Sequence, residues 1–447
     1  MKKNILYIIM LLLLIGTSNP LHAQKALSLT DALEMAKQGN KTIQIQTLEE
    51  IHSRELTRET KGGLLPNISA NAAYSHYFDK QQIFLPGSFA GTNKAVQDVA
   101  VGGRNTYNGF LSLNQPIYAP GLHRLTKAAL INEKIENEKT AKLKSQVALL
   151  VSTKYFDILM MNQQLNLLKQ SLQRNIRALN DSRSLFAQGR GLKADTLRSF
   201  IAVENLKSSV SYLNNNIDVS SIELKRLIGM EEPEEIKLSD NLDFDSKANQ
   251  SEFYKVDEAL KIAETNRNDL NIQELTIDFQ QKKLQAAKAE LLPQLSLIGQ
   301  YQLQAQADNM NLDNYTWPRT SYLGLQLSVP IFNGNRSNSQ INQENIKVQQ
   351  EKIRLIDLKD EIKTELAIII SKWKEALTQL DIHQTTVKSA ELNYQMIEDR
   401  FKNGLSSRLE LTDAELALTQ SKINYLNAVH NLRVLHVELQ HALGLLK

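Results

Sequence analysis

The chain has 447 residues with 52 basic and 49 acidic side chains, and its formal charge of +3 excludes the strongly basic footprint of a nucleic-acid-binding protein. It contains no cysteine, which excludes disulfides, thiolate metal sites, cysteine nucleophiles and a lipidated N-terminal cysteine. Only 18 glycines and 9 prolines interrupt the chain, so long helices are expected.

Residues 1–23 are typical of a secretory signal peptide. Lys2 and Lys3 precede an unbroken apolar run (5–15), and Ala23 offers a small residue at the expected cleavage position. The run is shorter than the roughly 20 residues that a helix needs to span a bilayer. We therefore predict a signal peptide over 1–23 and not a membrane anchor.

Two long stretches of the chain lack proline, one over 121–232 and one after residue 330. Inside an α-helix, glycine and proline cost about 1 and 3 kcal/mol, so each stretch predicts one very long helix, a glycine turn and a shorter return helix. The first long helix is predicted over 122–188, about 100 Å at 1.5 Å per residue. The turns are predicted at Gly189 and Gly404.

The two stretches belong to an internal duplication. Leu64-Leu65-Pro66 recurs as Leu291-Leu292-Pro293, and the Phe-x-x-Gly pattern that ends at Gly189 recurs at Gly404. The copied motifs follow one another in the same order in both halves. We therefore predict a first repeat over 24–229, a linker over 230–253 and a second repeat over 254–447.

Each Leu-Leu-Pro motif is expected to end a helix that starts at Thr30 in the first repeat and at Asp257 in the second. After the motif, apolar and polar residues alternate, which is the period of a β-strand. A second alternating stretch follows in each repeat. The four predicted strands are 67–75, 107–114, 295–304 and 323–329.

The composition of these strands favours a membrane barrel. None contains Asp, Glu, Lys or Arg, and aromatic residues gather near their ends. Charge-free strands of about ten residues with an aromatic girdle are typical of a lipid-facing barrel, although periodicity alone also permits a small sheet packed on a helix. Four strands cannot close a barrel, and an open sheet edge is not tolerated in lipid. Several chains are therefore expected to share one barrel.

The last predicted helix is apolar on two flanks. Two seven-residue repeats are displaced by two residues, which is about 200° of helix rotation. Such a helix packs against neighbours on both sides, as in the wall of a cylinder, whereas a plain coiled-coil stalk would show one seam. A secreted structural stalk or filament protein stays the alternative. The stripes are Leu411, Leu418, Tyr425, Leu432 and Leu439, and Leu409, Leu416 and Ile423.

This ordered set of motifs resembles the TolC-type outer-membrane efflux proteins of Gram-negative bacteria, also called outer membrane factors. The resemblance covers essentially the whole mature chain. It implies a homotrimer in the outer membrane, with a 12-stranded β-barrel built from four strands per chain and continued by a long α-helical barrel of coiled-coil hairpins in the periplasm. It also implies passive export together with a periplasmic adaptor protein and an inner-membrane pump. No enzyme activity, cofactor, metal or nucleic acid is expected, and the cargo and the class of pump stay open.

The resemblance also points to a functional site at the hairpin tips. In this family, the periplasmic entrance is surrounded by acidic residues that follow shortly after the tip glycine of the second hairpin. The corresponding positions here are Glu410 and Asp413, and the corresponding acid of the first repeat is Asp195. Crowded carboxylates attract cations, although an ordinary solvated helix face is the alternative. The tips, which would contact the adaptor, comprise Phe186, Gly189, Phe401, Gly404, Leu405 and Ser406. Ser406 stands where the family has a basic residue, which removes the usual cation of a salt-bridge lock.

Overall fold

The computed structural model describes residues 26–230, 236–242, 255–311 and 315–446. The predicted signal peptide lies outside these residues, as does most of the predicted linker. The chain divides into two compact units. One holds the described residues of 1–47, 139–270 and 358–447, and the other is Leu48–Glu138 with Asn271–Asp357. Each unit draws on both predicted repeats, and the boundaries of the repeats stay a prediction.

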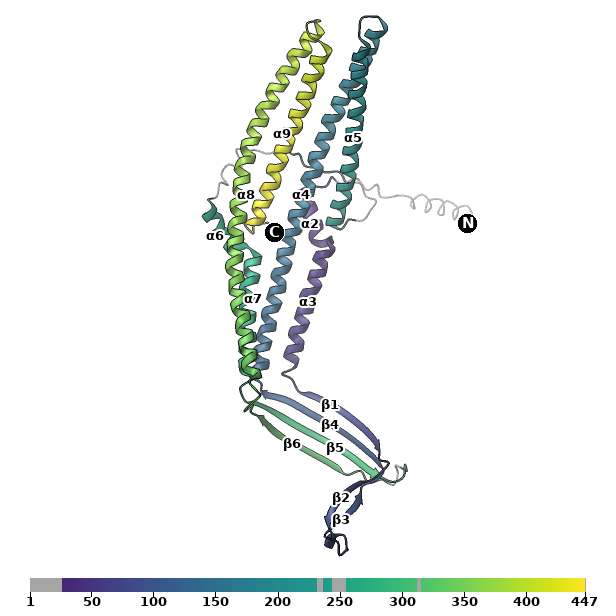
Figure 1. Cartoon of the computed structure of the whole chain (residues 1–447), viewed down its shortest axis with the longest axis vertical. Helices are drawn as coiled ribbons and strands as arrows, with labels where there is room; N and C mark the ends of the chain where they lie inside the picture. The colour runs from purple at the N-terminus through teal and green to yellow at the C-terminus, as the bar shows by residue number, and fades with distance from the viewer. Residues whose placement is uncertain (1–25, 231–235, 243–254, 312–314, 447) are drawn as a thin grey trace, which may run out of the picture. The chain divides into compact units, whose positions relative to one another are not determined.

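Two hairpins of long helices are the largest elements of the chain (Figure 1). Helix α4 spans Pro120–Ala187, within two residues of its predicted bounds, and α5 (Lys193–Ile228) follows the turn at Gly189. Helices α8 (Arg336–Lys402) and α9 (Arg408–Ala442) repeat this order around Gly404. In the described part of the chain, no helix combines the length and the apolar character that crossing a membrane requires.

The first helix of each repeat starts earlier than predicted. Helix α2 (Leu29–Gly39) begins after Ser28, whose hydroxyl accepts from the Asp31 N–H at 3.1 Å, while the Asp31 carboxylate accepts from the Ser28 N–H at 3.4 Å. This capping box satisfies free N–H groups of the first turn, so Thr30 lies inside the helix. Helix α6 (Val256–Asn266) likewise begins one residue before Asp257.

These first helices are also broken, contrary to the prediction of one continuous helix. The backbone is extended at Asn40 and at Arg267, where α3 (Lys41–Gly62) and α7 (Asn268–Ala289) begin. Neither residue is a helix breaker by propensity. At the first break, the Asn40 side-chain oxygen accepts from the Thr42 and Ile43 N–H groups at 2.9 and 3.3 Å and so caps α3. Asn40 and Arg267 also contact other helices.

The two breaks contact the ends of the return helices in the same way. The Asn40 side chain donates to the Leu227 carbonyl at 2.8 Å, near the end of α5. At the equivalent place in the second repeat, the Arg267 guanidinium donates to the Ala442 carbonyl at 3.1 Å, at the end of α9. The last carbonyls of a helix lack partners within the helix, so each break supplies a missing donor.

Close backbone contact makes this arrangement compact. Gly229 has φ +70° and caps α5, and a Cβ there would lie 2.4 Å from the Gly39 carbonyl carbon. Gly444 has φ +74° after α9, and its Cβ would lie 2.7 Å from the Asn266 carbonyl carbon. Both positions need glycine for conformation and for space.

The core of the first unit surrounds Tyr155 and Trp373, both almost fully buried. The Tyr155 hydroxyl lies 2.8 Å from the Leu27 carbonyl, which ties the start of the described chain to α4. Leu27 also forms a parallel bridge with Leu238, in the described part of the predicted linker. In α9, the stripe that starts at Leu411 is mostly buried, whereas Leu409 and Leu416 of the second stripe are exposed.

The second unit contains a four-stranded antiparallel sheet in the order β1-β4-β5-β6. The four predicted strands are confirmed, and most are longer than predicted. The two repeats meet at the pairing of β4 with β5, and β1 and β6 are the open edges. The strands are β1 (Asn67–His76), β4 (Asn105–Tyr118), β5 (Gln294–Ala307) and β6 (Arg319–Ser328).

The two faces of the sheet differ as the alternation predicts. On one face, Leu325 and Leu327 of β6 lie opposite Leu297 and Leu295 of β5, and the β6 leucines are exposed. On the other face, side-chain hydrogen bonds join strands, such as Gln302 to Asn108 at 2.9 Å. The sheet therefore has one exposed apolar face and one polar face on which amide side chains form hydrogen bonds.

A separate two-stranded ribbon was not predicted. Strand β2 (Gln81–Pro86) pairs with β3 (Val96–Val101), and a short 3-10 helix, η1 (Gly87–Phe89), lies between them. Because apolar side chains occupy both faces of this ribbon, its sequence lacks the period of two that reveals the other strands.

Candidate functional site

The tip of the first hairpin is a glycine turn. Gly189 has φ +70° and its N–H donates to the Phe186 carbonyl at 2.9 Å, while the Arg190 N–H donates to the Leu185 carbonyl at 2.9 Å. This left-handed cap satisfies the last carbonyls of α4. No atom lies within 4 Å of a Cβ built on Gly189, so only backbone conformation requires glycine there. The Phe186 side chain is exposed.

The second tip repeats this geometry. Gly404 has φ +74° and its N–H donates to the Phe401 carbonyl at 3.0 Å, while the Leu405 N–H donates to the Arg400 carbonyl at 2.8 Å. The Leu405 side chain is exposed at the turn. The two tips therefore share one backbone design, and any difference between them lies in their side chains.

Glu410 has a structural contact in addition to its predicted role. The Ser407 hydroxyl accepts from the Glu410 N–H at 3.2 Å, and the Glu410 carboxylate accepts from the Ser407 N–H at 3.4 Å and from the Ser406 hydroxyl. The hydrogen bond from Ser406, followed by that from Ser407, lowers the pKa of the Glu410 carboxyl. Ser406 thus helps to keep an exposed carboxylate charged at the start of α9.

The three predicted acids fall in two places. Asp413 is exposed one turn after Glu410, and residues three apart lie on the same face of a helix. Asp195 is on α5 in the first hairpin, half-buried, with the Arg198 guanidinium 3.7 Å from its carboxylate. The second tip therefore carries two neighbouring carboxylates, whereas the acid of the first tip has a cation beside it.

Arg408 is a tip residue that the sequence did not single out. Its guanidinium lies 5.4 Å from the centre of the Phe401 ring, so it stacks across the turn. Burial lowers the pKa of the Arg408 guanidinium. This contact joins the end of α8 to the start of α9 and stiffens the second tip.

Glu415 is a buried acid, 6% exposed, that joins the two hairpins. Its carboxylate accepts from the Arg174 guanidinium at 3.0 Å, from the Ser171 hydroxyl at 3.2 Å and from the Asn175 amide at 3.0 Å, all on α4. In the sequence Glu415 resembles any acid of a charged helix surface, and only the packing of α9 on α4 reveals its role.

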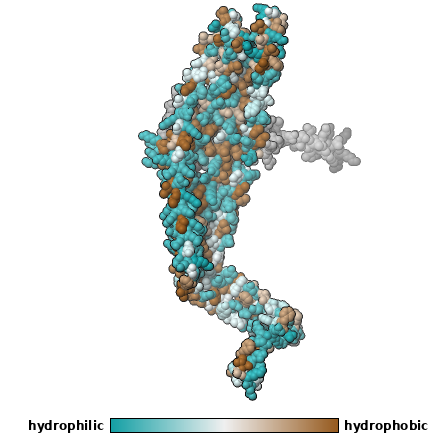
Figure 2. Space-filling view, viewed as in Figure 1, coloured by the Kyte–Doolittle hydropathy of each residue, from teal (hydrophilic) through white to brown (hydrophobic). Residues whose placement is uncertain are grey.

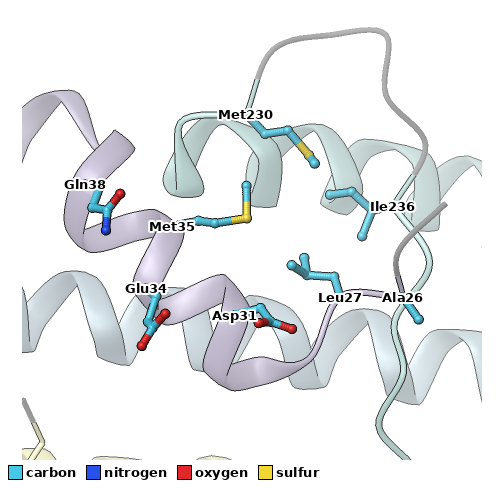
Figure 3. A pocket seen from close by; sticks show the side chains of 8 residues that line it. All are labelled: Ala26, Leu27, Asp31, Glu34, Met35, Gln38, Met230 and Ile236. Atoms are coloured by element: carbon cyan, nitrogen blue, oxygen red, sulfur yellow. The ribbon is translucent and has the colours of Figure 1, made fainter. Parts of the chain in front are cut away.

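A cavity of about 340 Å³ lies beside α2 (Figure 3). The close-up shows the thioethers of Met35 and Met230 near each other, with the side chains of Leu27 and Ile236 beside them. Its polar rim includes Asp31, which already caps α2. We assign no chemistry to this cavity, and among the described residues no cluster of His, Asp or Glu could hold a metal ion.

Comparison with known proteins identifies the family. The model of the outer membrane efflux protein family matches residues 32–230 and 259–445. The chain therefore belongs to the outer membrane efflux protein family. It is an outer-membrane channel protein of a Gram-negative efflux or secretion system, in a family of passive channels.

Two curated relatives align with nearly the whole chain. AprF, an alkaline protease secretion protein of Pseudomonas aeruginosa, is 22% identical over 425 residues, which cover 91% of this chain and 84% of AprF. The outer membrane protein TolC of Escherichia coli is 20% identical over 462 residues, which cover 99% of this chain and 87% of TolC.

Solved structures show the same fold. CusC aligns with a TM-score of 0.75 at 18% identity, over 93% of this chain and 92% of CusC. The outer-membrane channel OprN aligns with a TM-score of 0.75 at 16% identity, over 93% of this chain and 89% of OprN. The predicted fold of strands continued by long helical hairpins is thereby confirmed.

Proposed function

We propose that three copies of this chain close a single barrel and tunnel, and that this conduit exports its cargo passively after docking to a periplasmic adaptor protein and an inner-membrane pump. The observation that carries the proposal is the four-stranded sheet, which has two open edges and an exposed apolar face. Backbone groups at an open edge have no partner in lipid, so each edge must pair with another chain. Three copies, as the resemblance to TolC-type channels implies, supply 12 strands.

The helices support the same assembly. One stripe of α9 is buried within the chain, while Leu409 and Leu416 on the other flank are exposed. On α5, Ile201 and Ile222 are also exposed. Aliphatic side chains exposed along a long helix are typical of a surface that another helix covers. In a closed tunnel, the hairpins of a neighbouring copy would cover them.

The hairpin tips are proposed as the periplasmic entrance and the adaptor contact. Glu410 and Asp413 from three copies would place carboxylates around a narrow opening, which attracts cations and admits multivalent ones as blockers. The segment between Phe401 and Arg408, with exposed Leu405, would contact the adaptor.

Membrane fractionation followed by native mass measurement of the detergent-extracted complex tests the assembly. We expect the mature chain in the outer membrane, with a mass of three copies. Recovery of the mature chain in the soluble fraction without detergent would contradict the proposal and would favour a secreted coiled-coil stalk.

Substitutions on the two faces of the sheet test the barrel itself. Leu325→Arg places a charge on the apolar face and should cost about 2 to 4 kcal/mol near the bilayer midplane, so the yield of assembled trimer should fall. Gln302→Arg, on the amide face, is the matched control and should assemble normally. Equal assembly of both variants would show that the apolar face does not contact lipid.

A further inference from the structure

The β2–β3 ribbon has an exposed apolar tip. Phe84, Phe89 and Val96 are 73%, 83% and 59% exposed. Phe84 and Val96 lie diagonally across the two strands on one face, because Phe84 pairs with Asp98 and Pro86 pairs with Val96. Figure 2 shows brown, hydrophobic residues on this ribbon at the lower end of the view. The ribbon forms a sheet of its own, apart from the four-stranded sheet.

The turn between the two strands is closely packed. A Cβ on Gly87 would lie 1.9 Å from the Lys94 carbonyl oxygen, and the Thr92 N–H donates to the Gly87 carbonyl at 2.9 Å. This close approach of backbone to backbone holds the start of η1 against residues 92–94, which lead into β3.

The base of the ribbon is anchored on the sheet. Lys80, just before β2, forms an ion pair at 2.6 Å with Asp308, which follows β5. The other oxygen of the Asp308 carboxylate accepts from the Arg104 N–H at 3.2 Å, beside the start of β4. The base is therefore held over the middle strands, β4 and β5. The ribbon continues beyond the sheet and turns away from the line of its strands (Figure 1).

The length of the ribbon suffices to reach the centre of a shared barrel. With strands about 4.8 Å apart and tilted by about 40°, a 12-stranded barrel has a backbone radius of about 12 Å. Six residues of strand span about 20 Å. Three ribbons, one over the middle of each four-stranded sheet, can therefore meet on the barrel axis.

The charge of the ribbon permits such a meeting. Between residues 81 and 101, the only charged side chains are Lys94 and Asp98, which are of opposite sign. Each ribbon thus carries no net charge, with Asp98 beside Phe84 on the same face. A two-stranded ribbon is at best marginally stable in water without a covering partner. The occupant that fits an uncharged aromatic tip at this place is the same tip of the other copies.

We propose that the three β2–β3 ribbons of the assembled channel meet through Phe84, Phe89 and Val96 and narrow the outer mouth of the barrel. The proposal rests on the trimer proposed above. The contact is formed by the exposed apolar side chains of the tip, its partner is a second and a third copy of this chain, and its function is to restrict passage through the barrel.

Cysteine cross-linking tests the contact, because the chain has no cysteine of its own. In the extracted full-length channel, Val96→Cys should form a disulfide between copies under mild oxidation. Gln97→Cys is the matched control, since it lies next to Val96 on the opposite face of the same strand. It should stay uncross-linked under the same conditions.

Each outcome of this experiment decides the proposal. If native mass shows a trimer but Val96→Cys does not cross-link, or cross-links no more than Gln97→Cys, the ribbon contact is wrong and the trimer stands. If the extracted chain is monomeric, both proposals fall. Quenching of a fluorophore on Val96→Cys by a lipid-borne quencher would place the tip against the membrane and overturn the contact between copies.

Single-channel recording tests the consequence for passage. The double variant Phe84→Ser with Phe89→Ser should conduct more than the parent, because the smaller side chains leave the outer mouth open. Gln82→Ser, on the same face near the base of the ribbon, should conduct as the parent does. Equal conductance of all three channels would show that the ribbons do not restrict the mouth.

Discussion

The two repeats share a backbone and differ in their charges. Both have a break in the first helix that contacts the end of the return helix, and both hairpins end in a left-handed glycine. The first repeat uses the neutral amide of Asn40 at the break and pairs its tip acid with Arg198. The second uses Arg267 at the break and leaves two acids on one face at the tip. The two repeats thus keep the same backbone geometry while their side chains differ at the break and at the tip.

The largest expected effect is the difference in stability lost when the side chain at each helix break is replaced. The Arg267 side chain is 12% exposed. Its guanidinium forms ion pairs with the Asp269 carboxylate at 2.7 Å and with the Glu365 carboxylate at 2.6 Å. Arg267→Met leaves the partly buried Asp269 without its paired guanidinium, so the loss of stability should be about 3 kcal/mol, the lower end of the range for a broken buried pair. Asn40→Ala removes one hydrogen bond and should cost about 1 to 3 kcal/mol. Thermal unfolding of the helices, followed by circular dichroism, measures both, and an equal loss would contradict the comparison.

The same ion pair predicts acid sensitivity. Burial alone would raise the pKa of Asp269, but the hydrogen bond and charge of Arg267 outweigh it, and the pKa lies below the usual value. A carboxyl with a lowered folded-state pKa stabilises the fold above its unfolded pKa of about 4, and this contribution disappears as the pH falls through the folded value. Stability should therefore decline below about pH 4, and in Arg267→Met this particular pH dependence should be lost.

The two glycine turns allow a test of docking at the second tip. A leucine at Gly404 must adopt a positive φ, which costs about 1 to 2 kcal/mol, but its Cβ meets no atom within 4 Å. Gly404→Leu should therefore keep the trimer and its place in the outer membrane while export is lost, because the contact with the adaptor changes. Gly189→Leu places the same strain at the first tip, so comparing the two variants shows which tip docking depends on more. Loss of the trimer in Gly404→Leu would show that the turn is needed for assembly and not for docking.

The acids of the two tips should differ in their effect on conduction. Replacing Glu410 and Asp413 with alanine should reduce cation selectivity and relieve block by a trivalent cation, and the effect should be largest at low salt, where screening is weak. Asp195→Ala should change selectivity less, because Arg198 already offsets its charge. Single-channel recordings check both. If only Asp195→Ala alters selectivity, the entrance ring lies on the first hairpin.

The smallest expected effect concerns Ser406. Its hydroxyl is the first cause of the lowered pKa of Glu410, so Ser406→Ala should raise that pKa toward the usual value of about 4.3. The carboxylate would then become protonated at a higher pH, and cation selectivity should be lost earlier as the pH is lowered. Ser407→Ala, which removes the helix cap, serves as the comparison. Identical pH profiles for the parent and Ser406→Ala would remove this role of the hydroxyl.

The sequence by itself determined the elements whose pattern is local. The scarcity of proline predicted α4 and α8, the periods of two predicted the four strands of the sheet, and Gly189 and Gly404 marked the turns, because each property depends on residues close together in the chain. Only the tertiary structure decided the rest. Asn40 and Arg267 bond to carbonyls that are distant in the sequence, and Glu415 is buried because α9 packs on α4. The ribbon β2–β3 has apolar side chains on both faces, so its sequence does not show the period of two that predicts a strand. Its pairing is seen only in the tertiary structure.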